Sequence, residues 1–84
     1  MPTICIFLGI TIMMYLRDKE HNPPHVHAFY GGEAASVLIS NGELLDGSLP
    51  NKIAHLVKEF VIKNKDTLQT MWDTGVYKKL GGLN

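Results

Sequence analysis

The sequence predicts an α+β domain in which an antiparallel β-meander of four to five strands is followed by two helices packed on one face of the sheet. Two observations support this prediction. Up to residue 46, short apolar or alternating segments are separated by glycine and proline turns, as in hairpins. After residue 47, apolar residues recur at the three- and four-residue spacing of helices. A chain of 84 residues has room for one small core, so residues 1–84 are interpreted as a single domain.

Turn residues divide the first half of the chain into strands. Gly9 marks a bulge or turn, Pro23-Pro24 forces a loop, and Gly31-Gly32 and Asn41-Gly42 are hairpin signals. The strands expected between these turns cover residues 3–8, 10–17, 25–30, 34–40 and 43–45. The first of them is apolar and rich in β-branched residues, which predicts a strand buried on both faces.

Helical spacing begins at Pro50, which suits the first position of a helix. One apolar stripe is expected for this helix, formed by Ile53, Leu56, Val57, Phe60 and Val61. A break at residues 64–66 precedes a second helix, which is expected to continue to about Lys79.

Composition limits the function classes. Eight Lys+Arg balance eight Asp+Glu, which argues against a protein that simply coats nucleic acid or an anionic membrane. The balance is uneven, because residues 1–50 carry an excess of three acidic side chains and residues 51–84 an excess of three basic ones. The lone Cys5 excludes a disulfide scaffold and is expected in the core. The apolar start lacks a basic leader region and ends at Arg17, too early for a membrane span, so we expect a cytoplasmic protein.

Three of the four histidines lie within seven residues, at His21, His25 and His27. On a strand, His25 and His27 project from the same face and could bind one metal ion, with His21 as a third ligand. Carboxylates near this motif would complete a mixed set that suits zinc or a similar divalent metal. The candidate carboxylates are Asp18, Glu20 and Glu33. The alternative interpretation is that the histidines lie on the solvent side of the sheet without any ligand and that the prolines only shape the turn.

A wider surface follows if residues 10–17 pair with residues 25–30. Tyr15 and Arg17 would then flank the histidines, and Phe29 shares the histidine face. The candidate functional surface is therefore His21, His25, His27, Tyr15, Arg17 and Phe29. Ordinary cross-strand pairing is the alternative explanation of the same pattern.

The motif around these histidines resembles that of the DUF4160 family, a group of small, mostly bacterial proteins of unknown function. The segments that resemble the family are Met1-Pro2-Thr3-Ile4, Phe7 with Gly9-Ile10, Met14-Tyr15, His21-Asn22-Pro23-Pro24-His25-Val26-His27-Ala28, Tyr30-Gly31, Gly47-Ser48-Leu49-Pro50, and Leu68 with Trp72. This resemblance covers most of the chain.

The resemblance implies an interaction component of a toxin–antitoxin-like gene pair, which binds a small protein encoded nearby, or RNA, through the His/aromatic sheet face. The sequence differs from the family pattern at Met13, where members commonly have Arg. Only Arg17 could supply that positive charge on the same face. This difference argues against a role in RNA cleavage. The alternative function is a metal-dependent, hydrolase-like enzyme centred on His21, His25 and His27. A third interpretation is a structural homo-oligomer, and the open sheet edges predict a homodimer.

Overall fold

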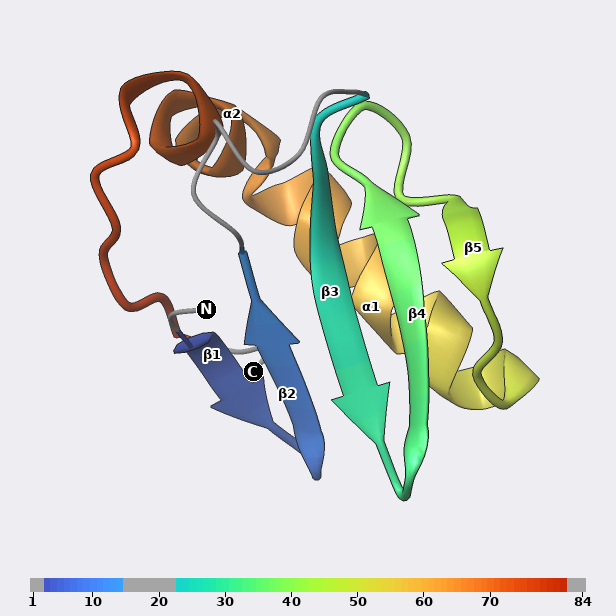
Figure 1. Cartoon of the computed structure of the whole chain (residues 1–84). Coiled ribbons are helices and arrows are strands. Elements are labelled where there is room, and N and C mark those ends of the chain that lie inside the picture. The colour runs from blue at the N-terminus through green and yellow to red at the C-terminus, as the bar shows by residue number, and fades with distance from the viewer. Residues whose placement is uncertain (1–2, 15–22, 82–84) are drawn as a thin grey trace.

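The computed structural model describes residues 3–14 and 23–81, which fold into one antiparallel sheet followed by two helices (Figure 1). The strands lie side by side in the order β1-β2-β3-β4-β5. The elements are β1 Thr3–Phe7, β2 Ile10–Met13, β3 His25–Tyr30, β4 Glu33–Leu38, β5 Leu44–Gly47, α1 Asn51–Lys63 and α2 Lys65–Thr74. The predicted α+β meander with two helices is confirmed.

Two tight turns set the register of the sheet. Gly31 and Gly32 both have positive φ, at 55° and 85°, and close a two-residue hairpin in which Tyr30 lies opposite Glu33. Leu8-Gly9 closes the β1–β2 hairpin in the same way, with φ of 51° and 79°. Leucine is unusual in this backbone region, because its Cβ crowds the following carbonyl.

The core lies between one face of the sheet and α1, which runs behind the sheet in Figure 1. The predicted helical stripe is buried apart from Leu56, which packs against the core while partly exposed. The ring of Phe60 stacks on that of Phe7 in β1, with centroids 5.2 Å apart. From α2, the core receives Leu68, Met71 and Trp72. Neither helix in the part of the chain that the structure describes is long and apolar enough to cross a membrane.

The first strand differs from the prediction that it is buried on both faces. Cys5 and Phe7 point into the core, but Ile6 is 68% exposed on the opposite side of β1. The reason is that α1 covers only one face of the sheet. Burial raises the pKa of the Cys5 thiol, which agrees with the expected core position.

The second helix is shorter than predicted. It ends at Thr74, because Gly75 adopts the left-handed conformation at φ 73° and its N–H caps the carbonyl of Met71. The chain after Gly75 then runs beside β1, where the Leu80 N–H donates to the Ile4 carbonyl over 2.9 Å (Figure 1). Val76, which falls within the predicted helix, is largely exposed as a result.

Candidate functional site

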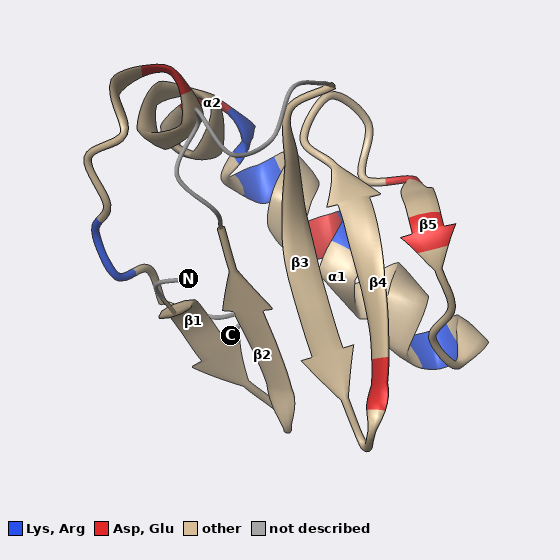
Figure 2. Cartoon of the chain, in the orientation of Figure 1, with Lys and Arg blue, Asp and Glu red and all other residues tan. Residues whose placement is uncertain are grey.

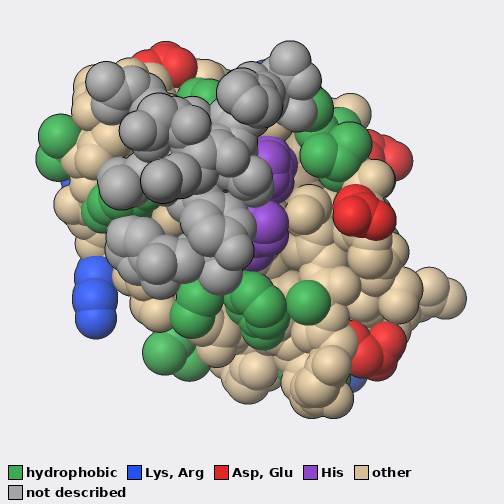
Figure 3. All heavy atoms as spheres, viewed as in Figure 1, with side chains coloured by type: hydrophobic (Ala, Val, Ile, Leu, Met, Phe, Trp, Pro, Cys, Tyr) green, Lys and Arg blue, Asp and Glu red, His purple; other side chains and the backbone are tan. Residues whose placement is uncertain are grey.

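The sheet face opposite α1, here called the outer face, carries the histidine motif. Antiparallel register places His27 between Met13 of β2 and Ser36 of β4. Two residues along β3, Phe29 lies between Thr11 and Ala34. Histidine side chains lie near the centre of this face, which Figure 3 views directly. The predicted location of His25, His27 and Phe29 on one face is therefore confirmed.

His25 is held in a defined orientation at the start of β3. It is only 6% exposed, and its Nδ1 lies 2.8 Å from the carbonyl oxygen of Pro23. Because a carbonyl oxygen only accepts, Nδ1 carries a proton, and in the neutral ring Nε2 holds the lone pair. The ring also contacts Trp72 of α2, with centroids 5.4 Å apart. The Pro-Pro loop and α2 therefore fix both the tautomer and the position of His25.

The two histidines of β3 lie against each other. The ring centroids of His25 and His27 are 5.0 Å apart, with an edge-on interplanar angle of 69°. Over residues 3–14 and 23–81, no three His, Cys, Asp or Glu side chains are grouped closely enough to hold a metal ion. Glu33 lies elsewhere, at the start of β4, where it accepts a 3.5 Å hydrogen bond from the Ser48 hydroxyl.

The other predicted site residues lie outside the described part of the chain. These residues are His21, Tyr15 and Arg17, together with the carboxylates Asp18 and Glu20. The fourth histidine, His55, lies on α1 and is exposed, with its Nε2 2.7 Å from Glu59 Oε2.

Two polar residues that sequence reasoning missed lie in line with His27. Ser36 of β4 is directly opposite His27, and Asp46 of β5 is directly opposite Ser36. These three residues, with neighbouring small residues, line a hollow of about 170 Å³. One pairing in this row could be predicted from the sequence, because a two-residue turn at Gly31-Gly32 requires Ser36 to pair with His27.

The basic residues that the structure describes lie outside the sheet. Figure 2 shows lysine positions on the helices and on the segment after α2, but on none of the strands. The described strand residues carry two charged side chains, Glu33 and Asp46, and both are acidic. The described part of the outer face therefore carries apolar and uncharged polar residues, and the edge strand β5 adds the negative charge of Asp46.

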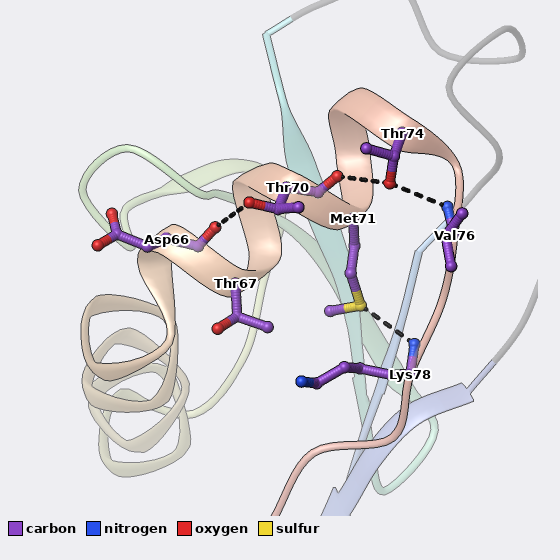
Figure 4. Close-up of a pocket in the computed structure, with 7 residues that line it drawn as sticks. All are labelled: Asp66, Thr67, Thr70, Met71, Thr74, Val76 and Lys78. Carbon is purple, nitrogen blue, oxygen red and sulfur yellow. Dashed lines mark hydrogen bonds between the residues drawn. The ribbon is translucent and has the colours of Figure 1, made fainter.

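A larger hollow of about 490 Å³ lies away from the histidines, between α2 and the segment after it (Figure 4). Part of its polar lining is already hydrogen-bonded within the protein. The hydroxyls of Thr70 and Thr74 donate to helix carbonyls, and the Lys78 N–H donates to Met71 Sδ over 3.3 Å. The Asp66 carboxylate points away from the space that Met71 enters (Figure 4). The outer face therefore offers the better set of groups for recognition.

The fold and the outer face define a class of protein: a small meander domain with a helix pair on one side and a histidine-bearing sheet face on the other. The family model for DUF4160, described as a domain of unknown function, matches residues 9–73. The chain belongs to this family, and the match spans β2 to nearly the end of α2. No curated protein and no solved structure matches the chain.

Proposed function

We propose that the chain is the interaction component of a toxin–antitoxin-like pair and binds a partner protein through the outer face of its sheet. The observation that carries this proposal is the exposure of Ile6 on that face, in a row with Thr11, half-buried Phe29 and Ala34. Exposed apolar groups rimmed by polar ones mark interaction sites on soluble proteins. Here the polar rim is the row that contains His27.

A protein partner is favoured over RNA by the distribution of charge. Binding to nucleic acid relies on Lys and Arg side chains that neutralise phosphates. None of the described strand residues is Lys or Arg, and Asp46, which lies in the row of His27 and Ser36, is negative. The lysines of α1 lie in the helical layer, behind the sheet (Figure 2).

The nature of the partner is supported by family membership. Members of the DUF4160 family are often encoded beside another small protein, and a single small domain suits one half of such a pair. We therefore take the product of the neighbouring gene as the partner to test.

Replacing Ile6 by Gln should weaken binding to this partner at least about tenfold, because an anchor buried at an interface commonly contributes more than 1 kcal/mol. The matched control is Ile62→Gln, since Ile62 is also an exposed isoleucine, at 53%, but lies on α1. Binding of that variant should remain within about twofold of the parent chain. Isothermal titration calorimetry of the two purified proteins measures both constants.

Equal loss in the two variants, or loss only in Ile62→Gln, would contradict the proposed surface. Recovery of RNA rather than protein with the native chain, together with a steep salt dependence of binding, would favour the RNA alternative.

A second candidate function, a metal-dependent enzyme, is favoured by the geometry of the histidine pair. We propose that His25 and His27 hold a divalent ion such as zinc, with His21 as the third ligand. The support is the 5.0 Å separation of the two rings and the hydrogen bond from His25 Nδ1 to Pro23. A bond of this kind orients metal-ligating histidines and leaves Nε2 for the metal.

Zinc titration of protein prepared without a histidine tag tests this second candidate. Trp72 is the single tryptophan and lies 5.4 Å from the His25 ring, so its fluorescence should change as zinc binds. The His25→Ala/His27→Ala double variant should lose at least about tenfold in zinc affinity, whereas His55→Ala should retain it. Unchanged zinc content in the double variant would rule out this site.

The homodimer expected from the sheet edges stays a prediction. One edge is partly occupied, because β1 accepts the Leu80 N–H at Ile4. The opposite edge is β5, whose four residues are all exposed. We propose β5 as the edge at which a second copy would pair.

A further inference from the structure

We propose that the hollow lined by His27, Ser36 and Asp46 is the anchor pocket for one arginine side chain of the partner protein. This inference rests on the proposed function and specifies the chemistry of its partner. The hollow crosses three neighbouring strands, β3, β4 and β5, on the outer face. Ala34, which belongs to the apolar row with Ile6 and Phe29, also lines the hollow.

The Asp46 carboxylate supplies the negative charge of the pocket. Its Oδ1 accepts a 2.9 Å hydrogen bond from the Gly47 N–H, which holds the side chain against the backbone. Within residues 3–14 and 23–81, the side-chain ion pairs are those of His55 with Glu59 and of Lys58 with Glu43. Asp46 takes part in neither, so a cation in the hollow would find a carboxylate with one oxygen already oriented and the other available.

Ser36 and His27 supply the rest of the wall. Directly opposed side chains on neighbouring antiparallel strands have Cβ atoms about 4.5–5.5 Å apart, and Ser36 is the residue between His27 and Asp46 in this row. A hydroxyl and a carboxylate both accept hydrogen bonds, and an imidazole offers a flat surface. Guanidinium has five N–H donors, no acceptor and a planar shape, so it matches this set better than a lysine ammonium does.

The size and charge of the hollow exclude other ligands. At about 170 Å³ it is smaller than the roughly 300–1,000 Å³ of typical small-molecule sites, but it has room for the end of one side chain. A phosphate or carboxylate would be repelled by Asp46. Among the residues that the structure describes, no third metal-ligating side chain joins His27 and Asp46 in a metal-binding group.

The first test is a titration of the ¹⁵N-labelled chain with N-acetyl-arginine amide at constant ionic strength, followed by NMR. N-acetyl-citrulline amide, which has nearly the same shape without the charge, is the matched probe. We expect the amide signals of Ser36, Asp46 and Gly47 to shift with the arginine compound only. The Asp46→Asn variant keeps an oxygen for the Gly47 N–H and should reduce these shifts at least about threefold at a given concentration. Equal shifts with both compounds, or shifts centred elsewhere, would overturn the proposal.

The second test uses the partner protein. Asp46→Asn should weaken its binding at least about fivefold, whereas Glu33→Gln, which removes a carboxylate from the same sheet outside the pocket, should change it less than about twofold. If Ile6→Gln weakens binding and Asp46→Asn does not, the anchor pocket is wrong while the binding surface stands. If neither variant weakens binding, both proposals are wrong.

Discussion

Replacing Gly47 by alanine is expected to destabilise the domain by about 3 kcal/mol or more. Gly47 has φ of 83°, where an added Cβ would lie 2.7 Å from the Cα of Ala35 and closer still to the carbonyl oxygen of Ala34. Both neighbours are backbone atoms of β4, so they cannot move aside as a flexible side chain would. The strained φ costs about 1–2 kcal/mol and the overpacking about 1–3 kcal/mol. Urea unfolding of the variant and the parent chain measures the difference.

Gly31→Ala is the matched control for this prediction. Gly31 also has positive φ, at 55°, but nothing lies within 4 Å of an added Cβ. Its loss of stability should be only about 1–2 kcal/mol, from the backbone conformation alone. If the two variants unfolded at the same urea concentration, β5 would not pack against β4 as closely as described, and the row that ends at Asp46 would lose its basis.

The second large effect is expected for Phe60→Ala. Phe60 is fully buried on α1 and stacks on Phe7, so its removal leaves a cavity between the helix and the sheet. Such substitutions cost about 3–5 kcal/mol, out of a total stability of about 5–15 kcal/mol for a typical domain. We expect the variant to unfold at a much lower urea concentration, or to be largely unfolded without urea.

The control for Phe60→Ala lies on the other side of the same sheet. Phe29 is half-buried on the outer face, where α1 does not pack. Phe29→Ala should therefore cost about 1 kcal/mol, for the partial loss of apolar contact. An equal loss of stability in the two variants would mean that the outer face is packed like the core, which is incompatible with an interaction surface.

Much of the fold could be predicted because local signals agreed with one another. Gly31-Gly32 fixed a two-residue hairpin, and the alternation of β3 then required His25, His27 and Phe29 to share a face. The stripe containing Ile53, Val57 and Phe60 predicted α1, because its spacing is that of a helix with one buried side.

Features set by contacts distant in the sequence could not be predicted. The exposure of Ile6 depends on which face of the sheet α1 covers, and nothing within β1 specifies that choice. The position of Asp46 depends on a register shift between Ser36 and Val37, where β4 meets β5. The end of α2 at Thr74 differs from these features, because it is set locally by the left-handed Gly75, which the sequence already contained.

The central claim is that a partner protein binds the outer face of the sheet, and chemical-shift mapping tests it most directly. The ¹⁵N-labelled chain would be titrated with the unlabelled product of the neighbouring gene, and the perturbed amides located on the fold. We predict that they centre on Ile6, Thr11, Phe29, Ser36 and Asp46, with the exposed side of α1 unchanged. Perturbations centred on the exposed side of α1 around His55 and Ile62, with the five strand positions unchanged, would contradict the claim.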